Sequence, residues 1–162
     1  MLPSDARIWI YQSNRMLTPS EEIQIGNRTA HFIDSWTAHN KELAGSFEIR
    51  HSIFLIMMID EKHSNASGCS IDKSLHFIQS LEKEFGITLT DRQIFAYRME
   101  NDIRLSRRNE FEVLIQAGTI TDETIIFNNL VNTKGDLEKT WEVPYRNSWH
   151  RLLAGGTQPI SS

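Results

Sequence analysis

The sequence predicts an α+β fold with a ferredoxin-like βαββαβ core. Its composition of 40% hydrophobic and 23% charged residues over 162 positions is typical of one globular domain. Segments with strand-like and helix-like periodicity follow in the order strand, helix, strand, strand, helix, strand, which is the split βαβ arrangement of ferredoxin-like sandwiches. We therefore expect a single domain over residues 1–154, made of this core (5–100) and an extension (101–154), and a disordered tail over residues 155–162.

The first strand and the first helix are predicted from side-chain type and from a cap. Residues 7–12, with the sequence RIWIYQ, combine β-branched and aromatic side chains, which favour a strand that is apolar on both faces. Thr18 suits a helix cap, Pro19 the first helical position, and Glu21 the capping-box position three residues after the cap. The helix should run to about His39. Its apolar positions recur at helical spacing: Ile25, Phe32, Ile33 and Trp36.

A hairpin is expected next. Residues 46–50 alternate between polar and apolar side chains, His51 and Ser52 form a short turn, and residues 53–59 are apolar without interruption. A strand that does not alternate should be buried on both faces. We therefore expect the extension, or a second copy of the chain in a homodimer, to cover the second face of the sheet.

The second helix is predicted to start at Ser70, and Gly86 stands where a helix would stop. A fourth strand follows over residues 92–100, ended by the turn pair Asn101 and Asp102. The extension then offers a helix, NEFEVLIQAG, a strand, TIIFNNLV, and a loop-rich stretch. The apolar positions of the second helix step by three or four residues: Ile71, Leu75, Ile78, Leu81 and Phe85.

Charge and hydropathy exclude several classes of partner. The net charge is −4 and both signs are interspersed, so the chain lacks the basic stripe that nucleic-acid binding requires. The longest apolar run, residues 53–59, is far shorter than the roughly 20 residues of a membrane span, so we expect no membrane insertion. A single cysteine agrees with a reducing compartment, and we expect a cytoplasmic location.

The predicted topology gathers three distant segments at one end of the sheet. The first helix ends there, the second strand begins there, and the third strand ends there before the turn into the second helix. Polar residues of all three segments should then share one rim: His39, Ser46, Glu48, Asp60, Ser67, Cys69 and Ser70.

A ligand-binding or regulatory domain is the first functional hypothesis. The start of the second helix offers unpaired backbone N–H groups and the positive end of the helix dipole, which suit a small anionic molecule. Asp72 in the first turn opposes this field. The expected ligand-binding residues are Ser67, Gly68, Ser70, Asp72, Glu48 and Arg50.

A thiol-dependent enzyme is the second hypothesis, with Cys69 as nucleophile and His39 or His150 as its base. Each residue also has an ordinary structural explanation. A lone cysteine is commonly a small buried residue, His39 suits a helix C-terminus, and Glu48 with Arg50 forms a same-face charge pair.

An interaction module or homodimer is the third hypothesis, with the apolar third strand and the C-terminal tryptophans Trp141 and Trp149 at the interface. No metal site is predicted, because the six histidines form no HExxH motif and no paired CxxC is present. No cofactor is implied either.

Several stretches resemble those of a small uncharacterised bacterial family, found mostly in Bacteroidetes, whose members are often labelled ABC transporter ATPases. They are RIWIYQSNR, SWTAHN, SFEIR, ASGCSID, TIIFNNLVN, WEVP and SWH, and the resemblance spans most of residues 5–153. The resemblance implies no mechanism. The ATPase label disagrees with the residues, because the nearest P-loop candidate, SGCSIDKS, has Ser67 and Asp72 at the two glycine positions and no LSGGQ-like signature is present.

Overall fold

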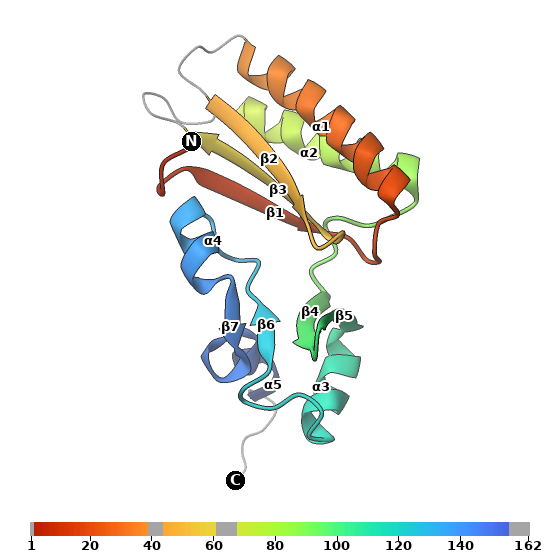
Figure 1. The fold of residues 1–162 in the computed structure, drawn as a ribbon, viewed down its shortest axis with the longest axis vertical. Helices are drawn as coiled ribbons and strands as arrows, with labels where there is room; N and C mark the ends of the chain where they lie inside the picture. The colour runs from red at the N-terminus through yellow and green to blue at the C-terminus, as the bar shows by residue number, and fades with distance from the viewer. Residues whose placement is uncertain (1, 39–43, 61–67, 156–162) are drawn as a thin grey trace. The chain divides into compact units, whose positions relative to one another are not determined.

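The computed structural model describes residues 2–38, 44–60 and 68–155. The chain groups into two compact units, shown in Figure 1: unit 1 comprises residues 1–91 and 132–137, and unit 2 comprises residues 92–131 and 138–162. Each unit carries its own antiparallel sheet together with helices. The α+β class is therefore confirmed. The sequence analysis placed the end of the core at residue 100, and the division between the two compact units falls after Asp91.

The sheet of unit 1 contains β1 (Arg7–Gln12), β3 (Phe54–Asp60) and β2 (Ala44–Arg50), in that spatial order and all antiparallel. The predicted hairpin between β2 and β3 is confirmed. His51 and Ser52, two of the three residues between the strands, both have φ of 58°, the left-handed value that is common in tight hairpin turns. The backbone N–H of Ile53 closes the turn on Arg50 O at 3.1 Å.

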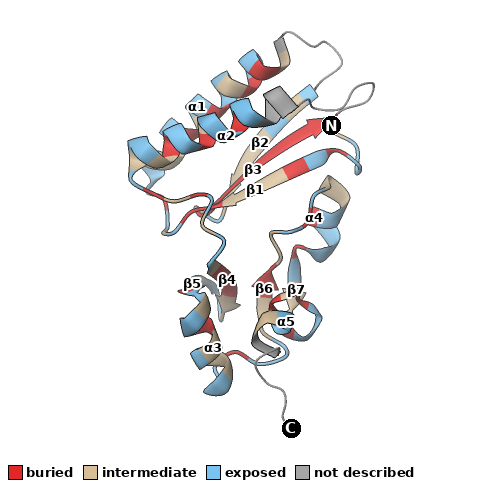
Figure 2. Cartoon of the chain, turned by 180° about the vertical axis from the view of Figure 1, so that it is seen from behind, coloured by how far each residue is buried: buried red, intermediate tan, exposed pale blue. Residues whose placement is uncertain are grey.

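Two helices, α1 (Pro19–Ala38) and α2 (Gly68–Phe85), lie on the same face of this sheet, as Figure 1 shows. All seven residues of β3 are buried, in agreement with its unbroken apolar run, and Figure 2 shows the strand in the colour of buried residues. The core under the helices consists of Leu17, Ile25, Ile33, Trp36, Leu55, Met57, Ile59, Ile78, Leu81, Ile87 and Leu89.

Local signals set the ends of both helices. Thr18 and Glu21 form the predicted capping box: Thr18 N donates to Glu21 Oε1 at 2.9 Å, and Glu21 N donates to Thr18 Oγ1 at 3.1 Å. Gly86 follows α2 with φ of 64°, the left-handed conformation that glycine adopts without a Cβ clash. Its N–H bonds Glu82 O at 3.0 Å and so satisfies a carbonyl at the helix end.

The fourth predicted strand forms, but in another sheet. β4 (Ile94–Met99) pairs with β5 (Asp102–Arg107) on one side and β6 (Ile125–Phe127) on the other, and β6 also pairs with β7 (Glu142–Pro144). A ferredoxin-like fold places all four core strands in one sheet. The ferredoxin-like topology is therefore not confirmed.

Local pairing explains this difference. A two-residue loop, Glu100 and Asn101, folds β4 directly onto the next stretch of chain, and the sequence analysis had assigned no strand there. Instead of a fourth strand, residues 132–133 of the extension pair with the outer edge of β1. Arg7 and Thr133 form an antiparallel bridge, and Ile8 N donates to Asn132 O at 3.0 Å.

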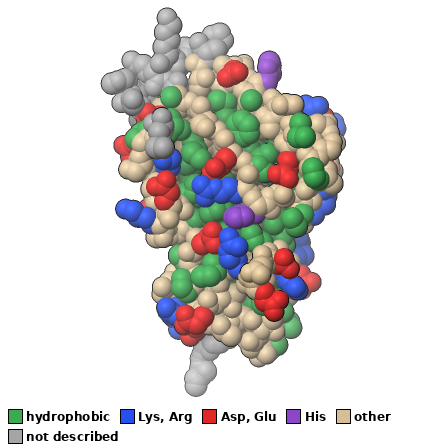
Figure 3. Space-filling view, viewed as in Figure 1, with side chains coloured by type: hydrophobic (Ala, Val, Ile, Leu, Met, Phe, Trp, Pro, Cys, Tyr) green, Lys and Arg blue, Asp and Glu red, His purple; other side chains and the backbone are tan. Residues whose placement is uncertain are grey.

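Unit 2 is completed by α3 (Arg108–Gln116) and α5 (His150–Gly155), whereas α4 (Lys134–Thr140) spans the boundary between the units. Trp141 is 1% exposed, as expected for a tryptophan that closes a core, and its Nε1 donates to Asn129 Oδ1 at 2.9 Å. The buried core contains Phe95, Tyr97, Phe111, Ile120, Ile126 and Tyr145. On the face drawn in Figure 3, acidic and basic side chains are interspersed, as the sequence suggested.

Candidate functional site

The backbone brings together the chain ends that the sequence analysis placed on one rim. α1 ends at Ala38 and α2 begins at Gly68, while Ala44, the first residue of β2, pairs with Asp60, the last residue of β3. Figure 1 shows all four ends at the same end of unit 1. The predicted site residues His39 and Ser67 lie outside the described residues, as do the side chains of Cys69 and Ser70.

Of the other predicted ligand-binding residues, Gly68 is the first residue of α2 and lies at that end, whereas Glu48 and Arg50 lie further along β2. Asp72 is exposed on α2. Arg50 Nε lies 2.5 Å from Glu48 Oε1, which is the same-face ion pair considered as the structural alternative. Arg50 stands six residues from Ala44 along β2, about 20 Å at the rise of an extended strand, so it is remote from the start of α2.

His150, the alternative base for Cys69, is a core residue of unit 2. It is 3% exposed, and Ser148 Oγ lies 2.5 Å from its Nδ1. The ring of Trp149 stacks on the imidazole at 4.0 Å, and Phe95 meets it edge-on at 4.6 Å. Burial lowers the pKa of His150 to about 4. A general base must reach a substrate proton, and these walls give a substrate no approach.

The most favourable candidate is a groove of about 510 Å³ on unit 1, between α1 and α2. Its volume lies within the range of about 300 to 1,000 Å³ that is typical of small-molecule sites. Five residues of α1 and two of α2 line it: Asn27, Arg28, His31, Phe32, Ser35, Phe77 and Ser80.

Two stacked rings join the helices within the groove. Phe32 of α1 and Phe77 of α2 lie with their ring centroids 4.4 Å apart and their planes 3° apart. Both rings are half-buried. Behind them, the ring centroids of Trp36 and Phe32 lie 5.3 Å apart, and those of Trp9 in β1 and Trp36 lie 6.0 Å apart. The groove is therefore backed by an aromatic row that runs from the sheet to α2.

Polar groups surround this aromatic pair. Arg28 Nη1 lies 2.6 Å from Glu84 Oε2, and the Arg28 guanidinium carbon lies 5.5 Å from the centre of the Phe85 ring. Ser80 Oγ donates to Phe77 O at 2.5 Å. Among the described residues, the exposed His31 makes no hydrogen bond or ion pair. The groove thus combines an apolar wall with a cation and several hydrogen-bonding groups.

The sequence carries a signal for this groove beside two core positions. Phe32 directly precedes the core residue Ile33, and Phe77 directly precedes the core residue Ile78. An aromatic residue beside a core position makes the apolar face of a helix wider than the part that packs in the core. Phe32 was predicted as part of the apolar stripe of the first helix, but Phe77 was not singled out.

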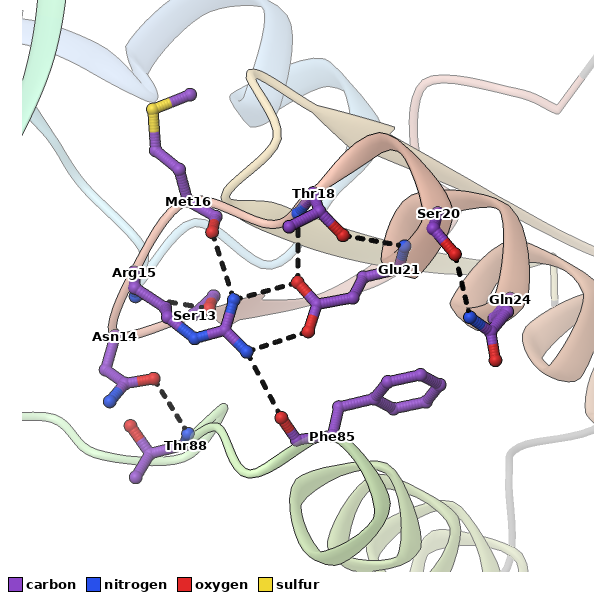
Figure 4. A network of polar contacts seen from close by, with 10 residues as sticks. All are labelled: Ser13, Asn14, Arg15, Met16, Thr18, Ser20, Glu21, Gln24, Phe85 and Thr88. Atoms are coloured by element: carbon purple, nitrogen blue, oxygen red, sulfur yellow. Dashed lines mark hydrogen bonds and ion pairs between the residues drawn. The ribbon is translucent and has the colours of Figure 1, made fainter.

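A polar network fixes the two helices at their other end, as Figure 4 shows. Arg15, in the connection between β1 and α1, binds the carboxylate of Glu21 with both of its terminal nitrogens, at 2.8 and 2.7 Å. Arg15 Nη2 also donates to Phe85 O, the last carbonyl of α2, at 3.2 Å. Asn14 Oδ1 accepts from Thr88 N at 3.0 Å. The start of α1 is therefore tied to the end of α2, which fixes the spacing of the groove walls.

Unit 2 has a second hollow, of about 560 Å³, lined by Gln93, Arg107, Arg108, Asn109 and Glu112. Its lining is entirely polar, and Arg108 Nε already faces Glu112 Oε2 at 3.4 Å. No aromatic or aliphatic residue lines it, whereas Phe32 and Phe77 line the groove of unit 1, which is therefore the better candidate.

Within the described part of the chain, no group of three or more His, Cys, Asp or Glu side chains is arranged to hold a metal ion. None of the described helices combines the length and apolar character that a membrane span requires. No protein-family model, no curated protein and no solved structure matches the chain.

Proposed function

We propose that the protein is a small ligand-binding domain whose site is the groove between α1 and α2. The observation that carries the proposal is the stacked pair Phe32 and Phe77, half-buried within a groove that also presents Arg28 and His31. Ligand sites typically combine apolar and aromatic walls with a few polar groups that fix orientation, and this groove has both.

The packing beneath the groove supports binding with little rearrangement. Ile33 and Ile78, the neighbours of the two phenylalanines, are 5% and 0% exposed, so each helix is anchored in the core directly beside the site. The Arg15 network holds the far end of the helix pair. A preformed site loses less conformational entropy on binding than one that must be ordered by the ligand.

Binding of a fragment library, measured by ligand-observed NMR and calorimetry, tests this proposal. Compounds that bind the wild type should bind Phe77→Ala at least about tenfold more weakly, because the aromatic contact is lost. Leu75→Ala is the matched control, since Leu75 is 41% exposed on the same helix and does not line the groove. Failure of every compound to bind the wild type, or equal binding to Phe77→Ala, contradicts the proposal.

The amino end of α2 is a separate proposal that comes from the sequence. It is supported by the start of α2 at Gly68 and by the convergence of chain ends around it. A small anion such as inorganic phosphate should bind there and be repelled in Ser70→Asp. Equal phosphate binding by the wild type and this variant argues against the helix-end site without affecting the groove.

A further inference from the structure

We infer that the groove between α1 and α2 accepts a flat aromatic molecule with one carboxylate, whose ring packs on Phe32 and Phe77 and whose carboxylate is bound by Arg28 and His31. The inference rests on the proposed function and adds to it the chemical class of the ligand.

The aromatic part of the ligand follows from the geometry of the two phenylalanines. Rings whose planes differ by 3° at 4.4 Å form a stack, and the exposed part of such a stack favours a further flat ring over a bulky aliphatic group. Trp36, behind Phe32 at 5.3 Å, is 9% exposed. Phe32 is therefore held in place by a buried neighbour.

The carboxylate follows from the charges around the groove. Arg28 and His31 are three residues apart on α1, so they project from the same side of the helix. None of the seven described residues that line the groove is acidic. An anion placed beside Arg28 and His31 therefore meets two nitrogen donors and no opposing carboxylate within the lining.

Glu84 does not prevent this arrangement. It lies 2.6 Å from Nη1 of Arg28, while a guanidinium offers five N–H donors in a planar fork. Arg28 can thus bind a second carboxylate without releasing Glu84. Both side chains of this pair are more than 40% exposed, so the contact is also open to exchange.

The test uses a panel of one-ring and two-ring aromatic carboxylates, each compared with its own neutral carboxamide, by calorimetry on the full chain. At least one carboxylate should bind the wild type about tenfold more tightly than its carboxamide, as expected for a hydrogen bond to a charged group. Arg28→Gln and His31→Gln should each reduce this preference, while Leu75→Ala should keep it. Glu84→Gln controls for the loss of the Arg28 partner and should also keep it.

The outcomes separate the inference from the proposed function. If carboxamides bind as tightly as carboxylates, and Phe77→Ala still abolishes binding, the groove is a ligand site but the anionic class is wrong. If preference for the carboxylate persists in both Arg28→Gln and His31→Gln, the anchoring residues are wrong and the inference falls. If no member of the panel and no fragment binds the wild type, both the inference and the proposed function fall.

Discussion

The guanidinium of Arg15 and the carboxylate of Glu21 form a bidentate ion pair, with Nη1 2.8 Å from Oε1 and Nη2 2.7 Å from Oε2. The same carboxylate accepts the backbone N–H of Thr18, so one side chain both caps α1 and holds the arginine that reaches Phe85 O. These hydrogen bonds, that of Arg15 first, lower the pKa of Glu21 from 4.5 to about 2.

Glu21→Gln should therefore destabilise the protein in a pH-dependent manner. A carboxyl group with a lowered pKa in the folded state stabilises fully above its ordinary value of 4.5 and loses this effect as pH falls towards 2. Thermal unfolding should show a lower melting temperature for the variant than for the wild type at pH 7, and this difference should disappear as the pH approaches 2. Asp34→Asn on the exposed face of α1 removes the same charge and should show no such trend. A constant difference at all pH values contradicts the ion-pair explanation.

Acid should also weaken the fold through His150. Its pKa is lowered to about 4 by burial, whereas the unfolded chain takes up a proton near 6.5, so the unfolded state binds more protons between these values. Stability is thus complete above about pH 6.5 and falls as pH decreases towards 4. Urea unfolding should show a loss of about 2 kcal/mol between pH 7 and pH 5 from this group.

His150→Phe should flatten this dependence between pH 7 and pH 5, because the ring remains in place among Phe95 and Trp149 without a titrating nitrogen. The exposed His76 is the control, and His76→Gln should keep the wild-type slope. An unchanged slope in His150→Phe would show that another group takes up the proton.

Residues close in sequence were predicted well because their signals are local. The capping box of Thr18 and Glu21, the stop at Gly86 and the turn at His51 and Ser52 each depend on contacts within a few residues, and all three are present. The partner of the fourth strand was not predictable in the same way. β4 could pair with the edge of β1 or with β5, the strand that follows it. Pairing with β5 closes a much shorter loop of chain than pairing with β1, and so costs less conformational entropy.

The strand β5 was missed although its sequence carries a weak signal. Ile103 and Leu105 alternate with charged and polar residues, as in a strand. This short stretch follows the pair Asn101 and Asp102, which is typical of a turn that ends a strand. The groove was missed for another reason. The stacking of Phe32 on Phe77 depends on the register between two helices that are far apart in sequence, and periodicity along one helix does not define it.

Two glycines of unit 1 should respond in opposite directions to replacement by alanine. A Cβ on Gly26 in α1 would meet only the ring of Phe47, at an ordinary 3.9 Å, so Gly26→Ala should stabilise by roughly 1 kcal/mol through helix propensity. A Cβ on Gly45 in β2 would lie 2.8 Å from Ile33 Cγ2 and 3.1 Å from Ile59 Cδ1. Gly45→Ala should therefore cost about 1 to 3 kcal/mol by overpacking.

Urea unfolding of the two alanine variants under identical conditions tests this pair of predictions. Each variant adds one methyl group, so the pair separates local crowding from the general effect of the substitution. Stabilisation by Gly45→Ala would show that β2 and α1 are not in close contact at this position.

The turn between β4 and β5 should be improved by glycine. Glu100 is exposed and has φ of 57°, a left-handed conformation that costs a residue with a Cβ roughly 1 kcal/mol or more. Glu100→Gly should relieve this cost and raise the free energy of unfolding by up to about 1 kcal/mol, the gain being reduced by the greater freedom of glycine in the unfolded chain. Glu100→Ala removes the same carboxylate but keeps the Cβ, so it should give no such gain. Equal effects of the two substitutions in urea unfolding would assign the change to the lost charge and would contradict the strained hairpin that pairs β4 with β5.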